Sequence, residues 1–232
     1  MLKVNTVARA LFDTGAEFVA LWDNHGGGGN LDYSLLDKRI ELIVPDNSKI
    51  RQSFAKDYGF DAIYFIGYHA MEGTVGAVLS HTWNSSKFQY FKINGKPAGE
   101  FKMDAYLAAE NGYSPVFFSG DDKACAEAKA HIPEIVTVET KKGISRNKAI
   151  FRDNEGLLSE LYEKAKLATA LRVEAKKLEF PLTFEIRYTR MEDAENALNI
   201  SLSEGMKCYY NGDAHTVLYI VEKLSQFDRL RR

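Results

Sequence analysis

Continuous apolar runs of strand length, each ending abruptly in a polar loop, constrain the fold of this chain most. The strongest run covers residues 61–68, and a second covers residues 18–22. An apolar run without alternation predicts a strand buried on both faces, as strands are in parallel sheets covered by helices. Apolar residues at helical spacing occur in residues 4–12, 100–111 and 121–130. This alternation predicts an α/β fold with a largely parallel sheet flanked by helices.

A change of composition near residues 148–154 predicts a boundary between two regions. We expect residues 1–150 to form an α/β domain and residues 151–232 to form a smaller C-terminal α+β region. The elements expected in the second region are a long helix, a strand and a final helix, over residues 157–178, 182–188 and 215–227.

Composition narrows the class of protein. The 232 residues carry 30 basic and 32 acidic side chains, so the formal net charge is −2. This balance argues against a nucleic-acid protein and against a polybasic membrane binder. No apolar run reaches the roughly 18–20 residues of a membrane span, and no signal peptide is recognisable. The two cysteines, Cys125 and Cys208, are far apart, which favours a reducing, cytoplasmic setting.

Three histidines and a glutamate are the candidates for chemistry. His25 and His69 each follow an apolar strand, and the carboxyl ends of strands in α/β sheets border the ligand crevice. His81 comes twelve positions after His69, and Glu100 opens a predicted helix. Two imidazoles and a carboxylate are a common ligand set for zinc. The alternative for each histidine is an ordinary solvated loop side chain.

Other polar residues have simpler interpretations. The four glycines at 26–29 lack the order of a phosphate-binding loop. Glu72 could support the ligands, although solvent exposure is the simpler reading. Asp121 and Asp122 are expected to cap a helix rather than bind a cation. Arg146 is expected to form an ion pair or to bind an anion.

Several short blocks occur in a distinctive order. They are Asp23-Asn24-His25 with Asn30-Leu31, Phe65-Ile66-Gly67-Tyr68-His69-Ala70, Gly76 with Ser80-His81, Ile93-Asn94-Gly95 with Gly99-Glu100, Ala105-Tyr106, Ser119-Gly120-Asp121-Asp122, and Ile144-Ser145-Arg146. In this order they resemble the DppA-type zinc-dependent D-aminopeptidase family. The resemblance covers about residues 7–150.

The resemblance implies a self-compartmentalising metallopeptidase. Members of that family hold two zinc ions per subunit and remove N-terminal D-amino acids, especially D-Ala, from short peptides. They assemble as decameric rings whose active sites face an inner chamber. Carried onto this chain, the resemblance places His25, His69 and Glu100 at metal-ligand positions and His81 at the catalytic position. The expected partners are short peptides and further copies of the chain, with no nucleic acid and no membrane.

The chain departs from the family pattern at its start. The family begins with a strand ending in Asp-x-Glu-Gly, whose aspartate bridges the metals and whose glutamate is another ligand. No such motif precedes residue 7, and Met71-Glu72-Gly73 stands in the wrong block to replace it. Without the bridge, two nearby cations lose the anion that screens their repulsion, although three ligands can still hold one zinc. Absence of the strand also predicts a gap or an exposed sheet edge.

Two explanations of this departure remain open. The chain is a fragment or begins at an internal methionine, or it is a short variant with a changed or lost metal site. The first functional hypothesis is therefore a zinc aminopeptidase that holds either two ions or one. The alternative is a catalytically impaired relative that acts as an oligomeric binding or scaffold protein. A third hypothesis is a different metal-dependent hydrolase on the same frame.

Overall fold

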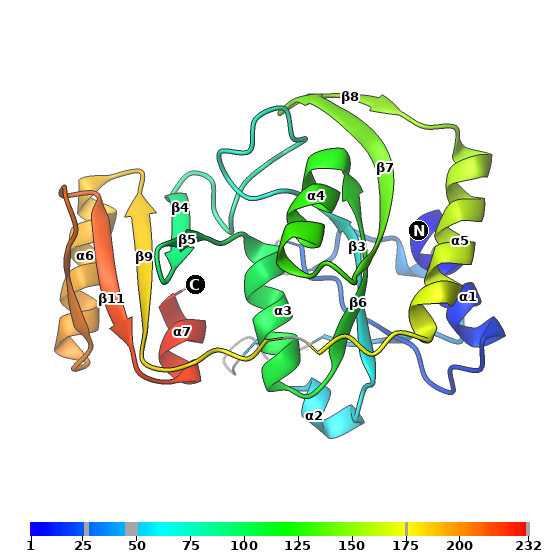
Figure 1. Ribbon diagram of the computed structural model, residues 1–232, viewed down its shortest axis with the longest axis horizontal. Helices are drawn as coiled ribbons and strands as arrows, with labels where there is room; N and C mark the ends of the chain where they lie inside the picture. The colour runs from blue at the N-terminus through cyan, green and yellow to red at the C-terminus, as the bar shows by residue number, and fades with distance from the viewer. Residues whose placement is uncertain (26–27, 45–50, 175, 231–232) are drawn as a thin grey trace.

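The computed structural model describes residues 1–25, 28–44, 51–174 and 176–230, and it contains two main sheets with helix α3 (Glu100–Glu110) between them (Figure 1). The first sheet has the strand order β3-β6-β7-β8. Its strands are β3 (Ala62–Tyr68), β6 (Ser114–Asp121), β7 (Val136–Ser145) and β8 (Lys148–Phe151). The first three strands run parallel, and β8 returns antiparallel to β7.

Helices cover both faces of this parallel sheet. Figure 1 shows α1 (Leu2–Asp13) and α5 (Asn154–Thr169) on one side, and α3 with α4 (Asp122–His131) on the other. The strands between them bury their side chains on both faces, and Phe117 and Phe118 of β6 are both fully buried. The predicted α/β fold with a parallel sheet flanked by helices is confirmed.

The second sheet is antiparallel and has the strand order β10-β11-β9-β4-β5. Its strands are β4 (Phe88–Ile93), β5 (Lys96–Pro97), β9 (Leu182–Tyr188), β10 (Lys207–Tyr210) and β11 (Thr216–Val221), with helices α6 (Met191–Ser203) and α7 (Leu224–Leu230). Since β4 pairs with β9, the sheet contains segments that lie before residue 150 as well as segments that lie after it. The division into domains at that residue stays a prediction.

One of the predicted elements is wrong, and two others are shorter than predicted. The predicted final helix over residues 215–227 is strand β11 followed by the short helix α7. Thr216, Val217, Tyr219 and Val221 are buried in β11, which is the β-branched and aromatic composition that sheets favour. The predicted strand over residues 18–22 has only two residues, Ala20–Leu21, as β1. Helix α5 ends at Thr169, before the predicted end at residue 178.

A cavity of about 1830 Å³ lies along one edge of β3. The other edge of β3 pairs with β6, and within the described part of the chain β3 has no second strand partner. The cavity is also bordered by α1, by β1 and by the short helix α2 (Ala55–Tyr58), and β1 pairs only with β2 (Glu41–Leu42). This agrees with the gap expected beside the sheet. One end of the cavity reaches His69 and Glu100.

Helix α3 begins where the chain passes close to two neighbouring residues. Gly99 precedes the helix in an extended conformation, and a Cβ atom there would collide with Glu127 and Met71. Glycine therefore lets the chain enter the helix at this point. Glu100 occupies the first turn, where the helix dipole favours a negative charge. Among the described residues, no helix is long and apolar enough to cross a membrane.

His131 shows how burial competes with the helix dipole. It is the last residue of α4, where a cation is favourable, and no chemistry is expected of it. Its ring meets Tyr106 edge-on at 5.2 Å between centroids, and Phe101 at 6.2 Å. Burial, followed by the charges of Lys102 and Lys176, lowers the pKa of His131 to about 4. Burial therefore outweighs the dipole, and the imidazole is neutral in the folded protein at neutral pH.

We predict that His131 makes the protein less stable in acid. Its pKa is about 4 in the folded state and 6.5 in the unfolded chain, so the unfolded chain binds more protons between these values. The free energy of unfolding should therefore fall by up to roughly 3 kcal/mol between pH 6.5 and pH 4 through this group alone. Urea unfolding at pH 7 and pH 4.5 should show a smaller loss in His131→Phe than in wild type. Equal losses in both proteins would contradict the prediction.

Candidate metal centre

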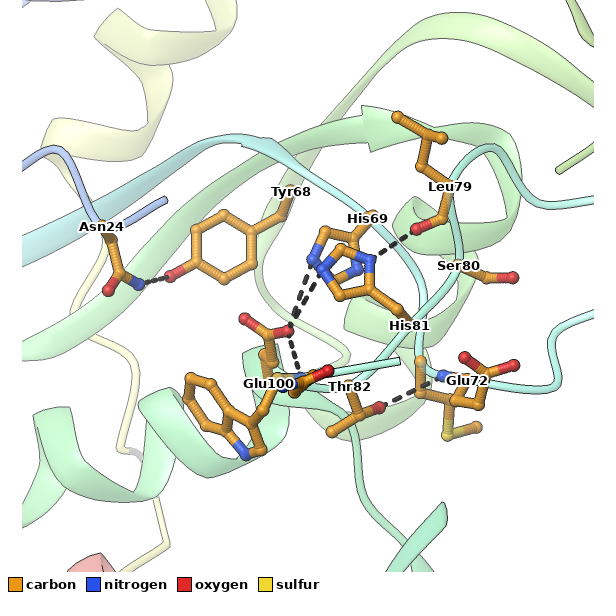
Figure 2. Close-up of polar contacts among 12 residues, drawn as sticks. Asn24, Tyr68, His69, Glu72, Leu79, Ser80, His81, Thr82 and Glu100 are labelled. Atoms are coloured by element: carbon orange, nitrogen blue, oxygen red, sulfur yellow. Dashed lines mark hydrogen bonds and ion pairs between the residues drawn. The ribbon is translucent and has the colours of Figure 1, made fainter. Parts of the chain in front are cut away.

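Three side chains from separate segments converge at the carboxyl end of β3. His69 follows that strand, His81 lies in the loop before β4, and Glu100 begins α3. One ligand atom from each lies within 4.8 Å of the others. The Nε2 atoms of His69 and His81 lie 3.5 and 3.8 Å from the same oxygen, Oε1 of Glu100. Figure 2 shows the two imidazoles stacked above the carboxylate, with ring centroids 3.7 Å apart.

Backbone carbonyls fix the orientation of both imidazoles. Nδ1 of His69 lies 3.0 Å from the carbonyl oxygen of Ala70, and Nδ1 of His81 lies 2.6 Å from that of Leu79. A carbonyl can only accept a hydrogen bond, so each Nδ1 carries the proton and each neutral ring presents the lone pair of Nε2. Burial is the largest effect on His69, and it lowers the pKa of this imidazole despite the nearby Glu100. The neutral form is the one that binds metals.

The three atoms that meet are therefore all acceptors. Two imidazole lone pairs and a carboxylate oxygen face one another at distances longer than a hydrogen bond. A cation at their centre would turn mutual repulsion into attraction. Imidazole nitrogen and carboxylate oxygen are ligands that suit zinc, and the carbonyl contacts at Nδ1 are the usual support of metal-binding histidines. The residues present fit a zinc ion.

Glu100 is oriented by a contact of its own. Its Oε1 accepts a hydrogen bond from the backbone N–H of Trp83 at 2.7 Å, and its side chain is only 13% exposed. Because Trp83 follows His81 by two residues, this bond ties the His81 loop to the start of α3. The backbone N–H of Glu72 donates to Thr82 Oγ1 at 3.1 Å, and this bond joins two sides of the same loop.

His25 is not part of this group. It is exposed after β1, on a loop that includes residues 26–27 outside the described part of the chain. Asp23 accepts hydrogen bonds from Asn30 N at 2.9 Å and from the Tyr33 hydroxyl at 3.2 Å, which closes the loop on itself. His25 nevertheless lines the same cavity as His69 and Glu100, and a charge on it would lower the pKa of His69. The structure thus brings together three of the four predicted site residues.

The remaining candidates support the loop between β3 and β4. Asp121 caps α4 by accepting from Ala124 N at 2.8 Å, as predicted, and it also accepts from Val78 N at 2.6 Å. Arg146 lies 4.0 Å from Glu72 and donates to the carbonyl of Ser80, next to His81. These residues hold the loop rather than forming a second site.

Sequence reasoning missed a buried polar cluster beside the site. Arg51, Asp104, Tyr68 and Asn24 are joined there by hydrogen bonds. The available signal was spacing, because Asp104 follows Glu100 by four residues and therefore lies on the same side of a helix. Arg51 had no such signal, since 53 residues separate it from Asp104.

Comparisons with known proteins show which chains this protein is similar to. A D-aminopeptidase from Bacillus subtilis (strain 168) is 32% identical over 145 residues, which are 62% of this chain and 52% of that protein. The chain thus spans about half the length of the curated relative that it matches. The solved structure of the Zn-dependent D-aminopeptidase DppA from Bacillus subtilis, described as a self-compartmentalizing protease, matches with a TM-score of 0.86. That match has 26% identity and covers 98% of this chain and 81% of the other.

The family comparison covers almost the whole sequence. The model of the D-aminopeptidase family matches residues 1–227, so it includes both sheets as well as the three converging side chains. The likeness in sequence and in fold points to the same group of hydrolases. The chain therefore belongs to the D-aminopeptidase family.

Proposed function

We propose that this protein is a zinc-dependent D-aminopeptidase that removes N-terminal D-amino acids, such as D-Ala, from short peptides. One observation carries the proposal: His69 Nε2, His81 Nε2 and Glu100 Oε1 converge as three acceptors in a chain of this family. The solved relative is described as Zn-dependent, which supports the choice of metal.

In this proposal His25, His69 and Glu100 hold zinc, and His81 is the catalytic residue. The carbonyl-oriented ring of His69 and the adjacent carboxylate of Glu100 support their part. His25 lines the same cavity and is the third donor. A second arrangement, with His81 as the third donor, is favoured by the distance of 3.8 Å between its Nε2 and Glu100 Oε1.

The chemistry follows from how each group is held. A zinc ion at this position would polarise the scissile carbonyl and lower the pKa of a water molecule toward 7. His81 takes a proton at Nε2 and returns it to the leaving amine, because its Nδ1–H is already engaged by Leu79. Glu100 Oε1 stabilises the imidazolium that forms. Trp22 and Trp83 line the cavity beside the site.

The number of ions is part of the proposal. Among the described residues, one cluster of potential ligand side chains converges, and it consists of two proposed ligands, His69 and Glu100, with the proposed catalytic residue His81. We therefore propose one zinc per chain rather than two. The same observation favours the second candidate function, a catalytically impaired relative that acts as an oligomeric binding or scaffold protein. A site with three protein ligands and no bridging carboxylate could bind metal too weakly for turnover.

Assembly and location complete the proposal. We propose a homo-oligomer, with a decameric ring as in the family, because the solved relative is described as self-compartmentalizing. Apolar side chains on the β7–β8 hairpin support this, since Ile144, Ile150 and Phe151 are exposed. A cytoplasmic location fits Cys125 and Cys208, which are both buried and free.

We predict that protein purified without added metal contains about one zinc per chain and releases D-Ala from D-Ala peptides. Removing the ion with a chelator should abolish the release, and Glu100→Gln should lower zinc content, because the amide is a weaker ligand. Glu155→Gln is the matched control, since Glu155 also lies in the first turn of a helix but is exposed. Elemental analysis measures the zinc content, and a D-Ala assay measures the release of D-Ala. Zinc-free, inactive protein after soaking would favour the impaired relative.

We predict that His25→Ala and His81→Ala differ in their effect on zinc affinity. Loss of a ligand should weaken zinc binding while loss of the catalytic proton carrier should not, so His25→Ala lowers zinc affinity and His81→Ala retains zinc. His81→Ala should lower kcat about 10²- to 10⁴-fold. His215→Ala is the control, because this histidine lies beside the antiparallel sheet. Zinc loss in His81→Ala together with normal binding in His25→Ala would reassign the third ligand.

A further inference from the structure

We propose that the buried ion pair of Arg51 and Asp104 is the positioning unit of the metal centre. The inference rests on the proposed function, because it concerns what holds the ligands of that site. Neither residue is a ligand or a catalytic residue in this proposal. Each acts through neighbours of His25, His69, His81 and Glu100.

The pair itself is bidentate and shielded from water. Arg51 Nε lies 2.6 Å from Asp104 Oδ1, and Arg51 Nη2 lies 3.0 Å from Asp104 Oδ2. The Asp104 side chain is fully buried, and that of Arg51 is 12% exposed. Two parallel hydrogen bonds between charged groups fix direction as well as distance. Because Asp104 lies one helical turn after Glu100, the pair also fixes the rotation of the first turns of α3.

Two site-bearing segments attach to Asp104 through hydroxyl and amide groups. The Tyr68 hydroxyl donates to Asp104 Oδ2 at 2.9 Å, and Tyr68 directly precedes His69. Asn24 Nδ2 donates to the Tyr68 hydroxyl oxygen at 2.9 Å, and Asn24 directly precedes His25. Figure 2 shows this link from Asn24 through Tyr68 beside the imidazoles. The end of β3 and the loop after β1 are therefore tied to the same carboxylate.

The third segment attaches to Arg51 through an aromatic ring. The guanidinium Cζ lies 4.9 Å from the ring centroid of Trp83 and 4.5 Å from that of Trp22. The backbone N–H of Trp83 in turn binds Glu100. Trp83 has a φ of +60°, which bulky residues rarely adopt and which persists only where the surroundings fix it. The ring contact with Arg51 is one of those surroundings.

This arrangement distinguishes positioning from simple stabilisation. A buried ion pair adds little stability compared with well-packed apolar groups, but it imposes one geometry on the groups around it. Both carboxylate oxygens of Asp104 and two nitrogens of Arg51 are engaged in the pair, so neither side chain is directed at a metal. Asn24, Tyr68 and Trp83 contact the pair directly or through Tyr68, and they lie within two positions of His25, His69 and His81 in sequence. Glu100 lies four positions before Asp104, which is itself a member of the pair.

The test removes one hydroxyl from the link. Tyr68→Phe keeps the ring, which packs on Phe65 and Phe118, and removes the hydroxyl that bonds both Asn24 and Asp104. Between Asn24 Nδ2 and Asp104 Oδ2 only the long direct contact of 3.4 Å is then left. Tyr188→Phe is the matched control, because its buried hydroxyl bonds Tyr219 in the antiparallel sheet at 3.0 Å. In metal-free protein with ¹⁵N-labelled histidine, Tyr68→Phe should shift or broaden the NMR signals of His69 and His25. Tyr188→Phe should leave these two signals unchanged.

A second readout uses zinc itself. Competition with a chromophoric chelator should show zinc affinity about 10- to 100-fold lower in Arg51→Lys and a smaller loss in Tyr68→Phe, as for other supports of metal ligands. Unchanged histidine signals and unchanged affinity in Tyr68→Phe, with a Tm lowered as much as in Tyr188→Phe, would overturn the inference. If Arg51→Lys does not fold, Tyr68→Phe decides alone. If wild type binds no zinc, the proposed function fails, and the metal-free spectra still decide the positioning role.

Discussion

Burial of helix α3 on two sides is the constraint on which the site depends. Phe101 and Ala105 belong to the core of the parallel sheet, and Met103 and Leu107 belong to the core of the antiparallel sheet. At 3.6 residues per turn these two pairs define two separate sides of the helix, and Glu100 and Asp104 lie on the sector between them. The helix cannot rotate without breaking one core. The carboxylate of Glu100, a proposed ligand, and the ion-pair carboxylate of Asp104 are therefore set by packing at a distance from the site.

Local signals in the sequence were sufficient for the elements that carry the site. The apolar run at residues 62–68 and the helix that starts at Glu100 were predictable, because each is defined by its own residues. The end of the chain was not, since Val217, Ile220, Val221 and Leu224 also fall at helical spacing. Pairing of β11 with β9 and β10 decides the outcome there, and such pairing depends on distant residues that a local window does not contain.

The site itself was predictable only where its residues stand at the ends of predicted elements. The position of His69 and Glu100 at element ends was visible, but the stacking of His81 on His69 depends on how the intervening loop returns. Arg51 gave no signal at all, because an arginine in a largely polar stretch, followed by Gln52 and Ser53, looks like a surface side chain until two tryptophans are found to contact it. Long-range contacts of this kind come from the topology and not from the pattern of any one segment.

The contacts that orient the potential metal ligands are more complete than the set of ligands itself. Both imidazoles have a carbonyl at Nδ1, Glu100 has a backbone donor, and the buried pair of Arg51 and Asp104 joins the segments together. Yet three acceptors are what the described residues bring to one ion, and the cavity along the free edge of β3 opens onto them. Geometry is thus already fixed before a metal binds. At the proposed zinc site, the supply of ligands, rather than the order of the scaffold, should set how tightly the ion is held.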